Sequence, residues 1–387
     1  MLRKIFIKNI NSIDECEIDF TKGNYKFAEE NVLGDVVNPI AIYGHNGSGK
    51  SSALTAIGFF ISLMYYPAEA LTPFIVNDFL FQDYLNGDKK DKSKIKGSIS
   101  LWFDIGEDNY EYLLETSRDN YISNEHLIKN GEIYFKREDR KYSYNNQDLD
   151  IKEYSSLAPL LRILASSEIM DTTIQSVFAY ISSFTFVNLP FINRGSFVTS
   201  KLFNNTNIND LLVKKSEDVK KLLKEYDNFP VYNITKSNKM APNGLVASQY
   251  NLVFDEKGFK RQIPLQMISV GMHNQSLLLS IVSAIPENGV LFIDDVDLAL
   301  HPSTIKSFLK VIRDRHIQVV FTLHNTYALQ MFRPDQVYFA KWSKGFSNFY
   351  RLSKVYPNIR EVNNIEKMYL SSIFDGAIEE KLLNEGN

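Results

Sequence analysis

Residues 44–51 have the residue types and the spacing of a loop that binds phosphate. Gly44, Gly49, Lys50 and Ser51 satisfy the pattern G-x-x-x-x-G-K-[ST]. Glycine lets backbone N–H groups approach phosphate oxygens without a Cβ in the way. These N–H groups, together with the N-terminus of a following helix, favour a bound anion. The competing interpretation is a glycine turn that holds no ligand.

The side chains of this loop extend the prediction to ATP and Mg²⁺. A lysine at the position of Lys50 reaches the β and γ phosphates and contributes to catalysis, and the Ser51 hydroxyl can occupy a coordination position on Mg²⁺. We expect nucleotide contacts from the whole run of residues: Gly44, His45, Asn46, Gly47, Ser48, Gly49, Lys50, Ser51 and Ser52.

Two carboxylates, Asp294 and Asp295, follow an apolar and strand-like run at 290–293. In a parallel sheet, ligands bind outside the carboxyl ends of the strands, where a phosphate loop also lies. We therefore expect Asp294 to be a metal ligand in the Mg²⁺ shell and Asp295 to orient or deprotonate the attacking water. One alternative is a pair of solvated loop acids. The other is a two-metal nuclease centre with Asp297, for which no matching acidic strand is evident upstream.

The elements that must position these residues follow an α/β pattern. The apolar run 39–43 leads into the loop, and residues 53–66 have the composition of a buried helix. Strands and helices then alternate between 248 and 340. Strands are expected at 250–254, 290–293, 318–323 and 336–340, and helices at 273–285 and 304–313. This alternation predicts a mostly parallel sheet covered by helices.

The middle of the chain has a different pattern. Strand-like segments at 97–105, 110–116 and 121–135, with turn residues between them, predict an inserted antiparallel subsheet. A polar run at 87–94 is expected to be a solvated loop, and helical patterns cover 157–183 and 208–226. The predicted division is an N-terminal ATPase lobe with the phosphate loop (1–83), inserted antiparallel strands (84–150), a helical lobe (151–245), a C-terminal ATPase lobe (246–345) and a tail (346–387).

Composition limits the function classes. The 387 residues are 44% hydrophobic and 23% charged, which is ordinary for a folded globular protein. A net charge of −3 gives no overall basic signature, so nucleic acid would need a local patch such as Lys136, Arg137, Arg140 and Lys141. The one cysteine, Cys16, is expected to be a small buried residue in a reducing cytoplasm. No signal peptide or membrane-spanning run is evident, so we expect a cytoplasmic protein without a membrane partner.

Further segments carry a resemblance to a known family. Residues 293–302, with the sequence IDDVDLALHP, resemble the Walker B and D-loop segment of ABC-type AAA family ATPases of the OLD-like group, which includes SMC-related and abortive-infection (AbiLi-type) ATPases. Upstream, ISVGM at 268–272 resembles the ABC signature, and downstream FTLHN at 321–325 resembles the switch-histidine segment. Residues 333–339 and 369–372 are similar to AbiLi-type ATPases. The resemblance covers about 1–60 and 245–380, and the order of the motifs is more specific than any one of them.

This resemblance implies a P-loop NTPase head of the ABC type, with the antiparallel subsheet and the helical lobe inserted. It also implies that Ser269 and Gly271 bind the γ-phosphate of ATP held by a second subunit, and that His324 contacts the γ-phosphate. A histidine at a strand end that bonds only to backbone is the alternative for His324. Asp295 stands where the family usually has Glu, so turnover is expected to be slow. Nothing in the chain resembles the Toprim nuclease domain that often follows such an ATPase.

The function implied is an ATP-hydrolysing enzyme that acts as an ATP-gated homodimer, with a higher oligomer left open. The resemblance further implies the sensor or regulator subunit of a bacterial anti-phage defence system that controls a separately encoded effector protein. The alternative is an SMC-like, DNA-binding ATPase of DNA repair or processing, which the basic residues at 136–141 could serve. The nucleotide subunit of a membrane transporter fits less well, because of the antiparallel insertion and the late signature segment.

Overall fold

The structure is a computed structural model of the chain. It describes residues 1–66, 96–117, 121–151, 156–189, 198–199, 208–226, 230–240, 246–256, 259–375 and 378. The polar run expected to be a loop at 87–94 lies outside these residues, as does the boundary expected after residue 83.

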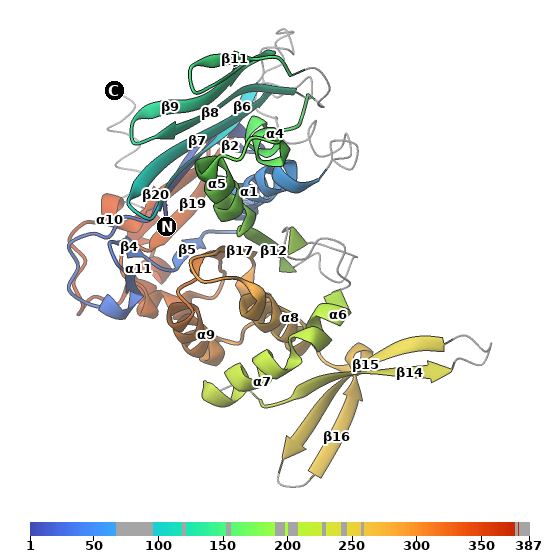
Figure 1. The fold of residues 1–387 in the computed structure, drawn as a ribbon. Coiled ribbons are helices and arrows are strands. Elements are labelled where there is room, and N and C mark those ends of the chain that lie inside the picture. Colours follow the sequence, from blue (N-terminus) through green and yellow to red (C-terminus); the bar gives the residue numbers. More distant parts are fainter. Residues whose placement is uncertain are drawn as a thin grey trace.

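A mixed sheet runs through the body of the protein (Figure 1). Its strands are β1 (Leu2–Ile10), β2 (Ile13–Asp19), β5 (Ile40–Tyr43), β6 (Lys96–Ile105), β7 (Asp108–Ser117), β8 (Tyr121–Lys129), β9 (Glu132–Glu138), β10 (Lys141–Tyr144), β11 (Gln147–Leu149), β12 (Thr185–Asn188), β13 (Val198–Thr199), β17 (Val290–Asp294), β18 (Gln318–Thr322), β19 (Val337–Ser343) and β20 (Phe346–Arg351). Within the described part of the chain, their order across the sheet is β11-β10-β9-β8-β7-β6-β1-β2-β20-β19-β5-β18-β17-β12-β13. Two short strands, β3 (Val32–Leu33) and β4 (Val36–Val37), form a separate hairpin.

The strands that carry the site are parallel neighbours. β12, β17, β18, β5 and β19 pair side by side in one direction. Their register places Asn188 opposite Asp294 and Thr322 opposite Ile42, so the carboxyl ends of these strands meet at one edge. The predicted α/β fold is confirmed, although the parallel strands and the antiparallel strands belong to one large mixed sheet rather than to a mostly parallel one. The edge where the parallel strands end is where such sheets bind ligands.

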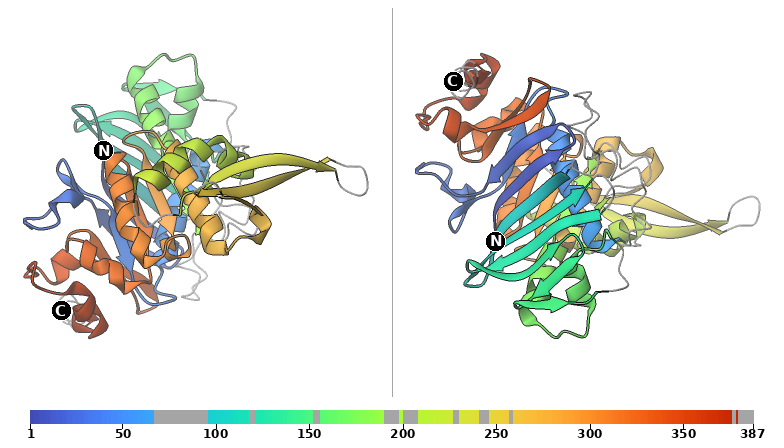
Figure 2. Two further views of the ribbon diagram at one scale, coloured as in Figure 1. Left: turned by 90° about the horizontal axis from the view of Figure 1, so that it is seen from below. Right: turned by 90° about the horizontal axis from the view of Figure 1, so that it is seen from above.

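Helices cover both faces of the parallel strands (Figures 1 and 2). The helices of the described residues are α1 (Lys50–Tyr65), α4 (Leu160–Ser166), α5 (Thr172–Ser182), α6 (Ile208–Lys214), α7 (Ser216–Glu225), α8 (Val270–Ala284), α9 (Pro302–Asp314), α10 (Leu352–Val355) and α11 (Ile365–Leu370). Alternate residues of β5 face opposite cores. Ile40 and Ile42 pack into the core under α1, while Ala41 and Tyr43 pack into the core under α8 and α9.

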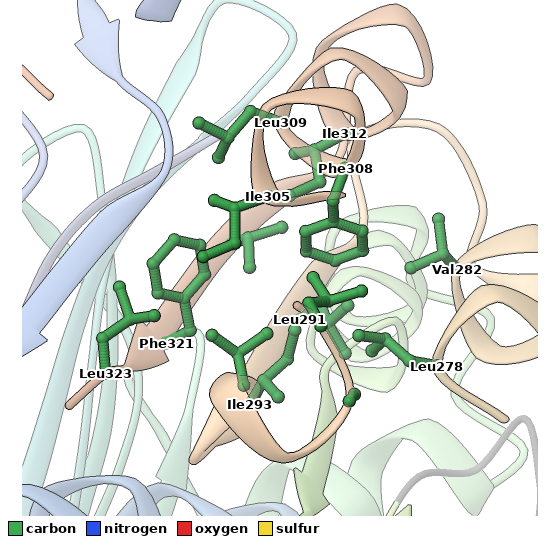
Figure 3. Packing of buried hydrophobic residues seen from close by; sticks show 14 of the residues in the cluster. Leu278, Val282, Leu291, Ile293, Ile305, Phe308, Leu309, Ile312, Phe321 and Leu323 are labelled. Carbon is green, nitrogen blue, oxygen red and sulfur yellow. The ribbon is translucent and has the colours of Figure 1, made fainter. Parts of the chain in front are cut away.

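The core under α8 and α9 fixes the strands that end at the site (Figure 3). Leu291 and Ile293 of β17 and Phe321 of β18 lie in this cluster together with Leu278 of α8 and Phe308 of α9. All five side chains are buried. Every residue of β17 (Val290–Asp294) is buried. A strand buried on both faces is apolar along its length, which explains the apolar run that precedes the acid at its end.

The antiparallel part of the sheet contains more strands than the sequence predicts. β6, β7, β8, β9, β10 and β11 pair in succession, and β6 joins them to β1. The segment 121–135 contains Asn130 and Gly131, which the sequence predicts as turn residues; both are at positive φ and they divide the segment into β8 and β9. A turn with two such residues matches the twist of a hairpin, so the chain reverses there.

Two expected helices are also divided. The pattern at 157–183 forms α4 and α5, and the pattern at 208–226 forms α6 and α7 with an interruption at Lys215. Leu211, Leu212, Val219 and Leu223 nevertheless share one buried side. Residues 346–387, expected to be a tail, contribute β20 to the sheet as well as α10 and α11.

One expected strand belongs elsewhere. The strand predicted at 250–254 as a member of the α/β series lies in β15 (Val246–Glu256), which pairs only with β14 (Asn233–Met240) and β16 (Phe259–Pro264) among the described residues. This separate antiparallel sheet, called the arm below, projects from the body (Figures 1 and 2). The prediction was wrong because a strand pattern does not indicate which neighbour supplies its hydrogen bonds. No described helix is long and apolar enough to cross a membrane.

Candidate nucleotide-binding site

The loop at 44–51 connects β5 to α1 at the carboxyl edge of the parallel strands, as the sequence predicts. A Cβ on Gly44 would collide with the carbonyl oxygen of Ala340, and one on Gly49 would collide with the side chain of Ser347. Gly49 also has φ +94°, a conformation that other residues rarely adopt. Both glycines are therefore required by the packing of the loop against β19 and β20.

The Lys50 side chain folds back over the loop. Its Nζ donates hydrogen bonds to the carbonyl oxygens of Gly44 (2.7 Å) and His45 (3.2 Å). Burial lowers the pKa of Lys50, while the nearby charges of Asp295, Asp294 and Asp297 act to raise it. The Lys50 ammonium group thus lies against the loop with carboxylates close by. A bound phosphate could replace the carbonyl oxygens of Gly44 and His45 as its hydrogen-bond acceptor.

The loop and the acidic strand end are in direct contact. The Ser51 hydroxyl donates to Asp294 Oδ1 (3.1 Å), so the two residues predicted to hold Mg²⁺ lie together. Asp294 is only 2% exposed, and burial raises its pKa. A carboxylate beside a hydroxyl supplies the hard oxygen ligands that Mg²⁺ takes in nucleotide sites. The donor set therefore fits the ion, although no described group of three or more acidic, histidine or cysteine side chains forms an all-protein metal cage.

Asp295 and His324 lie beside this pair. His324 Nε2 is 3.3 Å from Asp295 Oδ1, and the histidine side chain is 44% exposed. Asp295 has φ +53°, in the left-handed region that aspartate tolerates better than most residues. The two side chains predicted to act on water and on the γ-phosphate therefore face each other at the end of β17 and β18.

Asp297 holds the histidine segment from the other side. Its carboxylate accepts hydrogen bonds from the backbone N–H groups of His324 and of Asn325, the latter at 3.1 Å. Burial raises the pKa of Asp297. Because its Oδ2 caps these backbone groups, the geometry favours a structural role for Asp297 over the second ligand of a nuclease centre.

The signature residues lie apart from the loop of their own chain. Ser269 caps the N-terminus of α8, where its Oγ accepts from the N–H of Met272 (3.2 Å). Ser269 and Gly271 are both exposed, and a Cβ on Gly271 would meet nothing within 4 Å. No hydrogen bond in the described residues joins either of them to 44–51. One hydrogen bond joins α8 to the segment that follows Asp294 and Asp295. Asn274 Nδ2 of α8 donates to the carbonyl oxygen of Leu298 (3.2 Å) in the short helix η6 (Val296–Leu298).

Two polar residues at this edge were missed by sequence reasoning. Asn188 ends β12 opposite Asp294, is 8% exposed, and its Oδ1 has no hydrogen-bond partner among the described residues. Thr322 ends β18, and its hydroxyl contacts Asp294. For Asn188 the run Phe184–Asn188 was the available signal, because an apolar strand ending in a polar residue is also the pattern of 290–294. For Thr322 no signal distinguished it from other strand-end threonines.

Comparison with known proteins identifies the family. Residues 40–330 match the family described as "AAA domain, putative AbiEii toxin, Type IV TA system", a range that runs from β5 to beyond the histidine segment. The chain belongs to this family. The match confirms the prediction of an ABC-type AAA ATPase, a P-loop protein that binds ATP.

Solved structures of similar fold are SMC heads. An SMC head bound to the C-winged helix domain of ScpA aligns with a TM-score of 0.51 and 15% identity, over 90% of this chain and 96% of that one. The SMC head domain from Thermotoga maritima aligns with a TM-score of 0.44 and 14% identity, over 90% and 98%. At such identities the first alignment shows a shared fold alone, which agrees with the predicted ABC-type head. No curated protein sequence matches the chain.

Proposed function

We propose that this AAA-family protein binds and hydrolyses ATP with Mg²⁺. The observation that carries the proposal is the contact of Ser51 with Asp294, which joins the phosphate loop to the acidic strand end (3.1 Å). Lys50 and the loop N–H groups would hold the β and γ phosphates, and Ser51 and Asp294 would hold the metal. Bound Mg²⁺ would neutralise charge that develops on the phosphates. Asp295 orients water and accepts its proton, and His324 contacts the γ-phosphate.

We further propose that the working form is an ATP-gated homodimer. Ser269 and Gly271 lie on an exposed helix N-terminus, which suits an anion, yet they make no described contact with the loop of their own chain. A second copy could bring these residues to the γ-phosphate. Because γ-phosphate contacts would exist only in the closed dimer, ATP binding favours closure and hydrolysis reverses it.

For the biological role we propose a regulator of a separately encoded effector in a cytoplasmic anti-phage defence system of the OLD-like or AbiLi-like kind. The family description names a putative AbiEii toxin of a Type IV TA system, which supports the abortive-infection context of this proposal. The SMC head solved with a ScpA domain supports the idea that a head of this fold engages a separate protein.

The DNA-binding alternative has less support from the geometry. Arg137 is 2% exposed and donates its hydrogen bonds to the carbonyl oxygens of Asp139, Ser156 and Ala158. Lys136 pairs with Glu138 at 2.7 Å. The basic residues at 136–141 therefore do not present the combined patch that the sequence suggested, and a phosphate backbone would meet mainly Arg140 and Lys141.

Steady-state ATPase assays and nucleotide binding on the purified chain test the proposal. Lys50→Ala should abolish ATP binding, because the phosphates lose their cation, and Asp295→Ala should retain ATP and accumulate as a dimer. Lys221→Ala on the exposed side of α7 and Asp14→Ala on β2 are matched controls that should behave as wild type. Wild-type hydrolysis by either site variant would contradict the assignment. Salt-sensitive stimulation by duplex DNA would favour the alternative.

A further inference from the structure

Thr322 lies between the two acids and is fully buried. Its Oγ1 is 2.7 Å from Asp294 Oδ1 and 2.7 Å from the backbone nitrogen of Asp295. A third contact, to Asp295 Oδ1, is longer at 3.4 Å. One hydroxyl at the end of β18 thus touches both the predicted metal ligand and the predicted catalytic acid at the end of β17.

The single proton of this hydroxyl decides which contacts are hydrogen bonds. The Asp295 N–H is itself a donor, so the Thr322 oxygen accepts there and keeps its proton for another partner. The Asp294 carboxylate, at the shorter distance, takes that proton. No proton then remains for the Asp295 carboxylate. Its other contact is the His324 ring at 3.3 Å, and it keeps acceptor capacity for a water molecule.

The same hydroxyl fixes an unusual backbone conformation. Asp295 has φ +53° and ψ +58°, and a non-glycine residue stays there only where its surroundings hold it. The bond from the Asp295 N–H to Thr322 is the described contact that anchors this peptide to the neighbouring strand. If the bond were lost, the backbone of Asp295 could relax, and its short side chain would move away from His324.

We propose that Thr322 is the positioning residue of this site, whose hydroxyl orients the Asp294 carboxylate and holds Asp295 in the conformation from which it acts on water. The inference rests on the proposed ATP hydrolysis by Asp295. The bond from the Asp295 N–H to the Thr322 hydroxyl does not depend on that function, and it can be tested without nucleotide.

The experiment compares Thr322→Val, which keeps the shape but removes the hydroxyl, with Thr322→Ser, which keeps the hydroxyl. The valine variant should lose about 100-fold in kcat, because misplaced catalytic groups lose rate on this scale, while its affinity for ATP stays near that of wild type. The serine variant should recover most of the rate. If Thr322 had a purely structural role, Thr322→Val would lower ATP affinity and kcat together, and Thr322→Ser would not restore kcat.

A second readout uses the protein without nucleotide. Hydrogen exchange resolved at the Asp295 amide should be about tenfold faster in Thr322→Val than in wild type, because the N–H loses its acceptor, and unchanged in Thr322→Ser. Amides in the middle of β17 are the internal control. If the valine variant does not fold, Thr322→Cys provides the same comparison with a weak donor.

Three results would overturn the proposal. The first is a Thr322→Val variant with near wild-type kcat. The second is a Thr322→Ser variant as impaired as the valine variant. The third is an exchange rate of the Asp295 amide that is the same in Thr322→Val as in wild type. If the wild-type chain does not hydrolyse ATP, the proposed function fails. The exchange measurement then still decides whether Thr322 holds Asp295.

Discussion

Two polar residues at the carboxyl ends of the parallel strands, Asp294 and Asn188, are buried. Asp294 is buried at 2% exposure, and burial raises its pKa because a charged carboxylate loses its hydration there. Asn188 carries a buried oxygen without a described partner. Such exceptions to the rule that buried polar groups are paired are expected where a ligand is to be bound.

Asp294→Asn should therefore raise the thermal unfolding midpoint of the nucleotide-free protein by a few degrees while it abolishes hydrolysis. The amide keeps an oxygen that can accept from Ser51 and Thr322, but it carries no buried charge. Calorimetry without nucleotide checks the first effect. Asp14→Asn, at an exposed position of β2, is the matched control. A lower midpoint for the Asp294 variant would show that its charge stabilises the fold.

The size of this gain should depend on pH. Because the pKa of Asp294 is raised in the folded state, the folded protein binds a proton more readily than the unfolded chain does. Lowering the pH through the raised pKa therefore stabilises wild type relative to the variant. The advantage of Asp294→Asn should be full above the raised pKa and shrink as the pH falls through it, which denaturant titrations at several pH values would measure.

Elements, rather than residues, bring the site together. β17 and β18 end side by side, and the two segments that follow them are tied by Asp297 to His324 and Asn325. The link from Asn274 to Leu298 ties α8 to the same short helix, η6. The backbone of His324 and Asn325 is therefore held by a side chain from the segment that follows β17.

Asp297→Ala should release the histidine segment. Loss of a side-chain cap on backbone N–H groups destabilises by about 1 kcal/mol, and kcat should fall because His324 is no longer held beside Asp295. Asp297→Asn keeps one acceptor oxygen and should lose less of both. Denaturant unfolding and ATPase rates on the two variants check this. Equal effects would mean that the charge, not the cap, is what matters.

The sequence predicts those parts of the site that depend on local patterns. The strand, loop and helix at 40–65 and the acidic end of 290–294 are contiguous, so their residue types reveal them. Thr322 and Asn188 matter through parallel register with residues far away in the chain, which a single sequence does not contain. The arm was misassigned for the same reason, since pairing partners of β15 are not encoded in its own alternation.

At the scale of the whole molecule, we propose that two chains share each site, because Ser269 and Gly271 are exposed and make no described hydrogen bond with the phosphate loop of their own chain. Lys50→Ala and Gly271→Asp should each be inactive alone, the second because a carboxylate would face the γ-phosphate. The space beyond Gly271 is open, so the substitution should not disturb the fold. Mixed together, the two variants should regain roughly a quarter of wild-type activity, because half of the dimers would contain one intact site. Activity that stays at background after subunit exchange would argue against a shared site.

The position of β5 between β18 and β19 also has a consequence for how the chain folds. The phosphate loop precedes both strands that flank its own strand, because β18 begins at Gln318 and β19 at Val337. Pairings over such sequence separations form slowly, because a long stretch of chain must be closed before any contact is gained. During synthesis β5 therefore lacks both of its neighbouring strands until β18 and β19 have emerged. We expect the chain to become able to bind a nucleotide only after these strands have paired with β5.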